Sequence, residues 1–211
     1  MPVITLSREF GTGGGVIGRR VAEILGADFL DAKLCEEVAR RLQLPEETVH
    51  RWDERGEGLI IRLMRALQTA HPEFPMSGAS SDVVMPALSE ADRIWATEQE
   101  VIREQARVGP AVIVGRGGVF LFAGRPDTFH FRLVASKVTR IRRICEQTGW
   151  SPEECARRAD AADRERMAFL KRQFNADPRD PLHYAMVLNT GVLGLEEVAQ
   201  IIVRVAQSST A

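Results

Sequence analysis

Short apolar segments alternate with longer amphipathic segments along most of the chain. Residues 3–6 and 111–114 are mainly apolar and rich in β-branched side chains, as buried parallel strands are. Weaker runs predict further strands at 28–31, 128–135 and 184–188. Apolar residues recur at helical spacing over 16–25, 33–42, 58–68, 89–107, 137–148, 151–166 and 195–205. Strands alternating with helices predict the α/β class, with a parallel sheet covered by helices on both faces.

The link between the first strand and the first helix is rich in glycine. Gly11, Gly13, Gly14 and Gly15 fall within five residues, directly before the apolar positions of the helix. Glycine lets backbone N–H groups approach an anion closely, and a helix N-terminus adds unpaired donors and partial positive charge. A turn between a strand and a helix needs fewer glycines, so we favour a phosphate site over a simple turn.

Two kinds of phosphate site fit this loop incompletely. The pattern G-x-x-x-x-G-K-[ST] fails, because Gly14 and Gly15 stand where a lysine and a hydroxyl residue belong. Residues 13–18 spell G-x-G-x-x-G, but the dinucleotide fingerprint places its turn almost directly after the strand, whereas residues 7–12 intervene here. A P-loop without its lysine therefore ranks first, and a nicotinamide-dependent oxidoreductase remains an alternative.

Composition and charge give no sign of a nucleic-acid-binding, membrane-spanning or metal-binding protein. The 211 residues suit one α/β domain, and 45% of them are apolar. A net charge of −1 gives no reason to expect a nucleic-acid partner, and no apolar run is long enough for a membrane span. Three cysteines without metal-ligand spacing, and four scattered histidines, predict no metal site and suggest reduced thiols in the cytoplasm. Only three of the 28 basic residues are lysines, and arginine clamps phosphate well.

Six motifs in one order resemble those of the nucleoside monophosphate kinases, and most closely the cytidylate kinase-like family. They are ITLSREFGTGGGVIGRRVAE at 4–23, FLD at 29–31, VIVGRG at 112–117, LVAS at 133–136, DAADRER at 160–166 and AMVLNTGVLGLEEVAQII at 185–202. The resemblance implies one three-layer P-loop kinase domain over residues 1–211. It also implies a helical acceptor-binding region at about 32–108 and a helical lid at about 151–180.

The same resemblance implies transfer of the γ-phosphoryl group of ATP, with Mg²⁺, to CMP, dCMP or a similar nucleotide. It implies small-molecule nucleotides as partners, a cytoplasmic protein and a possible homodimer. The chain departs from the family pattern at five positions. In the loop, Gly14 replaces the phosphate-binding lysine, and Gly15 and Val16 replace small or hydroxylated residues. Gly117 replaces the aspartate of G-R-D, and Ala159 replaces the first arginine of the lid motif. The lost lysine and Gly117 keep open a second hypothesis, a catalytically silent protein that binds nucleotide or phosphate.

Site residues follow by position in these motifs. The expected phosphate and ATP contacts are Gly11, Thr12, Gly13, Gly14, Gly15 and Val16. The expected catalytic residues are Arg8, Asp163 and Arg166, and the expected acceptor contacts are Asp31, Arg116, Asp163 and Arg166. Arg8 is the first candidate to replace the missing lysine, because phosphoryl transfer needs positive charge at the transferring oxygens.

Each of these residues also has a simpler interpretation. Arg8 could form a salt bridge with Glu9 or with a lid carboxylate, and Asp31 could begin a helix. Asp163 and Arg166 lie three residues apart, which also fits an ordinary ion pair within a helix. Arg19, the second candidate cation, is expected at the surface. A solvent-facing stripe is expected for Arg140 and Arg143.

Overall fold

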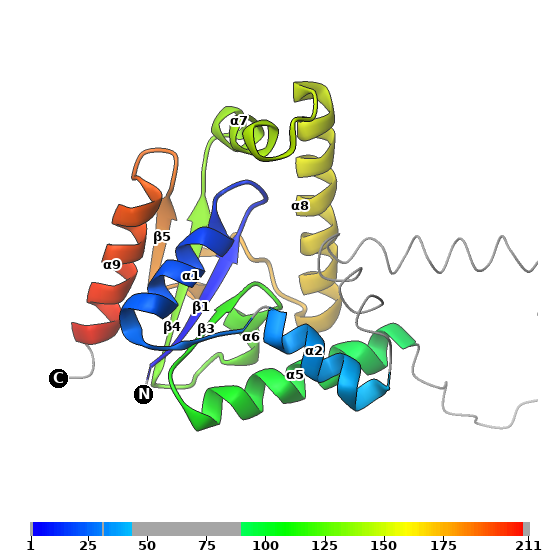
Figure 1. Ribbon diagram of the computed structural model, residues 1–211, viewed down its shortest axis with the longest axis vertical. Helices are drawn as coiled ribbons and strands as arrows, with labels where there is room; N and C mark the ends of the chain where they lie inside the picture. The colour runs from blue at the N-terminus through cyan, green and yellow to red at the C-terminus, as the bar shows by residue number, and fades with distance from the viewer. Residues whose placement is uncertain (1, 31, 44–89, 209–211) are drawn as a thin grey trace, which may run out of the picture.

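The chain forms a five-stranded parallel sheet with strand order β2-β3-β1-β4-β5. A computed structural model describes residues 2–30, 32–43 and 90–208 (Figure 1). The strands are β1 Val3–Arg8, β2 Asp28–Leu30, β3 Ala111–Val114, β4 Thr128–Val134 and β5 Met186–Asn189. The predicted α/β class and parallel sheet are confirmed.

Helices connect these strands close to the positions that the sequence predicts. They are α1 Gly14–Leu25, α2 Ala32–Leu42, α5 Glu90–Val108, α6 Gly118–Leu121, α7 Lys137–Thr148, α8 Pro152–Phe174 and α9 Leu195–Ser208, with the short 3₁₀ helix η1 Pro181–His183. The sequence pattern missed α6 and η1, and it placed the start of the last strand two residues early. Tyr184 ends η1 instead, and its hydroxyl donates to the carbonyl oxygen of Pro178. Predicted segments at 44–47 and 58–68, and a loop predicted at 71–86, lie outside the described residues.

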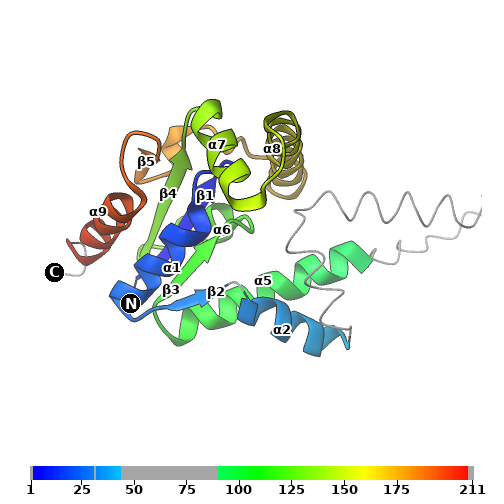
Figure 2. The same cartoon turned by 45° about the horizontal axis from the view of Figure 1, so that its top comes forward.

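Helices cover both faces of the sheet and make two cores. Successive strand residues point to opposite faces, so neighbours in β1 join different cores. Ile4 and Leu6 pack with α1 and α9, whereas Val3 packs with α2 and α5. Figures 1 and 2 show α1 and α9 along one side of the sheet, and α2 beside α5 near the β2 edge. Within the described residues, no helix is long and apolar enough to cross a membrane.

The glycine-rich loop lies where the strand order reverses. β1 is flanked by β3 and β4, and the chain continues from β1 toward the β2 edge before it returns to β4 on the other side. Ligands of open α/β sheets bind at the carboxyl ends of the strands at such a switch point. Figure 1 shows α7 across this end of the sheet, with α8 upright beside it. Phe10 from the loop packs against the buried side chains that join α7 to α8, namely Ile144, Cys155 and Ala159.

Candidate functional site

The loop of residues 9–13 is held from outside through its carbonyl oxygens. Three arginines on α7 and α8 donate to carbonyls at alternate positions of the chain. Arg166 Nη1 is 3.0 Å from Arg8 O, Arg140 Nη1 is 3.0 Å from Phe10 O, and Arg143 Nη1 is 3.4 Å from Thr12 O. The Thr190 hydroxyl, which follows β5, also donates to Thr12 O at 2.9 Å. Carbonyl dipoles thus point toward the arginines and away from the end of β1.

The expectation that Arg140 and Arg143 form a solvent-facing stripe was wrong. Only 10% of the Arg140 side chain is exposed, and Arg143 donates to both oxygens of Thr190. Arg140 precedes the buried Ile144 by four residues, so the two share one face of α7. That spacing was the one sequence signal for a buried arginine, although it could not show what the guanidinium would meet.

Several N–H groups at the glycine-rich end of this loop and the start of α1 have no acceptor in the described part of the protein. Among the hydrogen bonds of the described residues, none uses the N–H groups of Gly11, Gly13, Gly14, Gly15 or Val16. Thr12 differs, because its N–H and its hydroxyl both donate to Glu9 O, at 3.4 and 2.8 Å. The first turn of α1 adds partial positive charge. Five of the six expected phosphate contacts therefore offer a free backbone donor, as an anion site requires.

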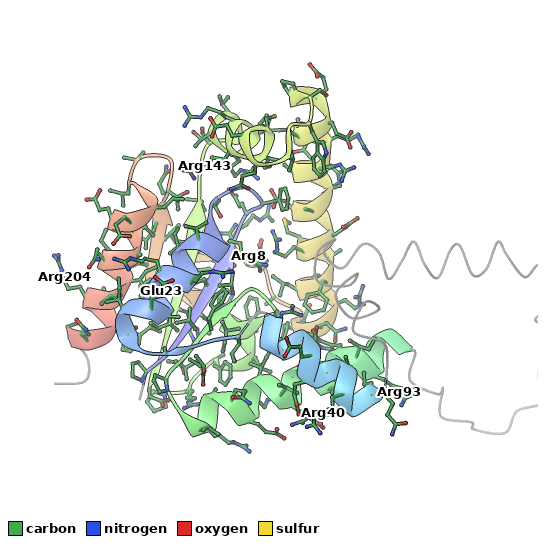
Figure 3. The ribbon with its side chains drawn as sticks, in the orientation of Figure 1. Arg8, Glu23, Arg40, Arg93, Arg143 and Arg204 are labelled. Atoms are coloured by element: carbon green, nitrogen blue, oxygen red, sulfur yellow. The ribbon has the colours of Figure 1, made fainter. Side chains whose placement is uncertain are left out.

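Arg8 runs along the start of α1 toward the end of β3. A Cβ atom on Gly14 would lie 3.3–3.4 Å from Arg8 side-chain carbons, and one on Gly115 would lie 1.5 Å from Arg8 Nη1. The guanidinium thus lies against Gly115, where φ is +78° and only glycine is easily accommodated. Figure 3 shows Arg8 in the space between α1 and α8. Gly14 stands in place of the usual lysine, and the side chain of Arg8 lies directly beside it.

Two of the expected acceptor contacts lie at the same end of the sheet. Arg116 follows β3, and its Nη1 lies 2.5 Å from Glu98 Oε1 on α5. Arg166 on α8 contacts the loop through Arg8 O. Asp31, the third expected acceptor contact, lies outside the described residues.

Asp163, the remaining expected contact, forms the predicted ion pair with Arg166 at 3.2 Å. It also accepts the Phe10 N–H at 2.8 Å and Arg140 Nη1 at 2.6 Å. One carboxylate on α8 therefore joins α7, α8 and the loop. α8 is thus packed on the loop through Asp163 and Arg166, two residues expected to contact the acceptor.

Comparison with known proteins now identifies the family. The model of the cytidylate kinase-like family matches residues 3–192, from β1 to the residues after β5. This chain belongs to the cytidylate kinase-like family. The dinucleotide-binding alternative gains no support, because its common strand order is 3-2-1-4-5-6 and the order here is 2-3-1-4-5.

Solved structures share the fold at low sequence identity. An uncharacterized protein from Eubacterium ventriosum has a TM-score of 0.68 at 19% identity, with 98% of each chain covered. A gluconokinase from Sinorhizobium meliloti has a TM-score of 0.54 at 14% identity, covering 99% of this chain and 95% of that one. A shikimate kinase from Bacteroides thetaiotaomicron has 0.51 at 16%, covering 99% and 98%. The fold is therefore that of the P-loop kinases.

One curated relative is a uronate isomerase from Corynebacterium glutamicum. It is 24% identical over 132 residues, which are 60% of this chain and 25% of the relative. The chain thus spans about a quarter of that protein, so the likeness carries no conclusion about activity.

The missing aspartate of G-R-D has a steric explanation. Gly117 has φ +63°, and a Cβ atom there would lie 2.4 Å from the Phe174 ring. Phe174 belongs to a set of stacked rings at the end of α8 that share edge or tilted contacts: Trp95, Phe120, Phe169 and His183. In this chain an aromatic ring fills the space that the family's aspartate would need.

Gly117→Asp is expected to destabilise the fold by about 2 kcal/mol, because the new side chain overpacks against Phe174 at a left-handed backbone position. Chemical denaturation measures the change. Gly124→Asp is the matched control, because Gly124 also has positive φ and meets no atom within 4 Å. Equal losses in both variants would mean that the ring is not the cause.

His130, on β4, should make the stability of the protein depend on pH. Its Nδ1 lies 2.7 Å from the Thr5 hydroxyl. Burial lowers its pKa below the usual 6.5, and a backbone hydrogen bond at Phe122 opposes this only in part. The unfolded chain therefore binds the proton at higher pH than the folded protein does.

The free energy of unfolding is expected to fall as pH is lowered from about 7 through 6.5 toward the folded pKa of His130, where protonation in the folded state limits further loss. His130→Gln is expected to flatten that part of the profile, while His183→Gln is the control on a partly exposed ring. Denaturant unfolding at a series of pH values measures both. A higher pKa for His130 in the folded protein, read from its NMR titration, would contradict this account.

Proposed function

We propose that the protein transfers the γ-phosphoryl group of ATP to a nucleoside monophosphate, CMP or dCMP before others. The supporting observation is the loop at the switch point, where arginines bind carbonyl oxygens while the N–H groups of Gly11 and of residues 13–16 have no acceptor among the described residues. Because the chain belongs to the cytidylate kinase-like family, we infer that the anion bound there is a phosphate group of a nucleotide.

The donor phosphates would lie on the N–H groups of Gly11 and of residues 13–16, with Arg8 as the cation beside them. An oxygen of the acceptor phosphate attacks the γ-phosphorus, the bond to the β,γ-bridging oxygen breaks, and ADP leaves with the electron pair. Arg8 then stabilises the negative charge on the transferring and leaving oxygens. Its place beside Gly14 supports this role.

The acceptor would bind at the carboxyl ends of β1, β3 and β4, between α5 and α8. Arg116 and Arg166 supply positive charge there, and Asp163 supplies acceptors for donor groups of the base or ribose. Asp31 is proposed as a further acceptor contact only from its place in the FLD motif. Asp163 and Arg166 also touch the loop, so acceptor binding and the donor site would share contacts.

For Mg²⁺ the described residues offer no ready set of ligands. No three His, Cys, Asp or Glu side chains gather in the part of the chain that the structure describes. Gly15 stands where the P-loop pattern carries its serine or threonine, and the Thr12 hydroxyl is already used on Glu9 O. We therefore assign no protein ligand to Mg²⁺, which in many kinases is held largely by phosphate oxygens and water.

Release of ADP across a panel of acceptors tests the proposal. The panel holds CMP, dCMP, UMP, AMP and GMP, together with gluconate and shikimate, which the names of two structural neighbours suggest. Fastest turnover with CMP or dCMP supports the proposal. Turnover with gluconate or shikimate alone would refute the nucleotide acceptor.

A silent nucleotide-binding protein is the second candidate, favoured by the lysine-less loop and by Gly117 in place of the aspartate of G-R-D. It predicts calorimetric binding of ATP and CMP without ADP release from any member of the panel. The same two measurements, made on one preparation, therefore separate the two functions.

A further inference from the structure

Arg132 is a buried arginine that none of the sequence motifs singled out. It lies two residues before the end of β4, paired in register with Ser7 of β1, and only 9% of it is exposed. Within the described residues its one hydrogen bond is a long one, 3.4 Å from Nη1 to Ser7 Oγ. A guanidinium carries five N–H donors, and buried polar groups are normally hydrogen-bonded. This side chain is therefore built into the end of the sheet with most of its donors unused.

A second buried arginine has an unused donor at the same place. Arg140 is 8% exposed, and its Nε is buried without a hydrogen-bond partner among the described residues. The Glu9 carboxylate lies between the two guanidinium groups, 3.8 Å from Arg132 Nη2 and 3.5 Å from Arg140 Nε. Charge-assisted hydrogen bonds are about 2.7–2.9 Å long, so Glu9 balances the charge without satisfying the donors.

Two other carboxylates near this pair of arginines are already bound. Asp177 is held by Arg179 through hydrogen bonds of 2.8–3.2 Å, and Asp163 is held by Phe10, Arg140 and Arg166. Glu9 is different, because 28% of its side chain is exposed and it belongs to the loop itself. Its carboxylate can turn toward solvent by rotation about side-chain bonds, which would open the space between Arg132 and Arg140.

The position of this space separates it from the donor site. Leu6 and Leu133 point toward α1 and α9, so their neighbours Ser7 and Arg132 point to the opposite face of the sheet. The free N–H groups of the loop lie at the start of α1, on the other side of β1. An anion at Arg132 would therefore face the donor phosphates across the end of β1.

We propose that Arg132 and Arg140 form an anion subsite that binds the phosphate group of the acceptor, and that Glu9 occupies it in the ligand-free protein. The assignment to the acceptor rests on the proposed function. The acceptor phosphate displaces the Glu9 carboxylate and completes the hydrogen bonds that both guanidinium groups lack. Arg132 then contacts the substrate directly, and Glu9 sets the affinity of the empty site.

Two substitutions test this in opposite directions. Arg132→Met keeps an unbranched apolar stem and removes the charge, and it is expected to weaken CMP binding roughly tenfold to thirtyfold while ATP affinity stays within about twofold. Glu9→Gln removes the competing charge and is expected to strengthen CMP binding about threefold or more. If Glu9 and the two arginines form a purely structural ion pair, both variants should bind CMP more weakly than the wild-type protein. Arg142→Met, on the exposed face of α7, is the matched control.

Calorimetry with CMP, cytidine, inorganic phosphate and ATP provides the readout. Cytidine should bind weakly to every variant, and inorganic phosphate should follow CMP if the subsite reads the phosphate alone. Should Arg132→Met fail to fold, Arg132→Lys is used, with an expected drop in the ratio of CMP to cytidine affinity. Unchanged CMP affinity in the Arg132 variant, or weaker CMP binding in Glu9→Gln, overturns the proposal.

The test is independent of turnover. If the wild-type protein binds CMP through Arg132 but releases no ADP, phosphoryl transfer fails while the subsite stands. If ADP is released at a normal rate and Arg132→Met leaves the KM for CMP unchanged, transfer stands and the subsite fails.

Discussion

Arg8→Ala is expected to lower the rate of phosphoryl transfer by roughly two orders of magnitude or more, because charge stabilisation at the transferring group is among the larger catalytic terms. Arg8→Lys should recover only part of the loss, since an ammonium and a guanidinium place their donors differently. ADP release at saturating ATP and CMP measures the effect. Calorimetric affinity for ATP should change far less than the rate.

A lysine at position 14 gives the complementary test. In the wild-type protein the new side chain would crowd Arg8, whose carbon atoms lie 3.3–3.4 Å from the required Cβ position. In the Arg8→Ala background only the contact with the Cβ of residue 8, at 3.4 Å, remains of these, and Gly14 is not at a left-handed backbone position that would strain a side chain. Gly14→Lys is therefore expected to restore activity to Arg8→Ala and to impair the wild-type protein.

Arg19→Ala is the control for this series, because Arg19 is exposed and stacks over the Phe29 ring, 5.5 Å from its centroid. It should leave turnover unchanged. Full turnover in Arg8→Ala, or a large loss in Arg19→Ala, would move the cation role away from Arg8.

Asp163→Ala is expected to lower the free energy of unfolding by about 3 kcal/mol, because it leaves a buried arginine and the Phe10 N–H without their acceptor. It should also weaken binding of ATP, since the loop loses a contact that fixes its shape, in addition to the loss of acceptor binding. Denaturant unfolding and calorimetry measure the two effects.

Asp160→Ala provides the comparison on the same helix. Asp160 lies one turn earlier and pairs with Lys137 at 2.7 Å, but both side chains are well exposed. Exposed pairs contribute little, so its loss is expected to stay below about 1 kcal/mol. Similar losses in both variants would show that Asp163 has no special place in the loop.

The elements that the sequence predicted best are those with strong local signals. The strand at 111–114 and the helix at 137–148 have the predicted bounds, because an uninterrupted apolar run and a serine cap define them. Ser136 accepts the Thr139 N–H, as a helix cap should. The first strand runs two residues beyond its apolar part, since Ser7 and Arg8 pair with β4 despite their polarity. Periodicity cannot register such polar extensions.

The site was less predictable, because its contacts join residues far apart in the sequence. Arg140 meets Phe10 O across 130 residues, and no periodicity in α7 indicates a carbonyl partner. Gly117 could be recognised as a departure from the family, but the ring that excludes a side chain there lies on α8. The sequence could predict which residue types lie near a phosphate loop. It could not predict which of them support the loop and which contact a ligand.

The arginine contacts to the loop also determine when conformational entropy is lost. Glycine has the largest backbone freedom to lose, so a loop with several glycines is costly to order. Contacts from Arg140, Arg143 and Arg166 order it as the protein folds, before any phosphate arrives. A ligand then meets a preorganised set of donors and need not order the backbone itself. Part of the folding free energy is therefore used to order the loop, which raises its affinity for a ligand. Substitutions that weaken the packing of α7 or α8 should lower ligand affinity before they unfold the protein.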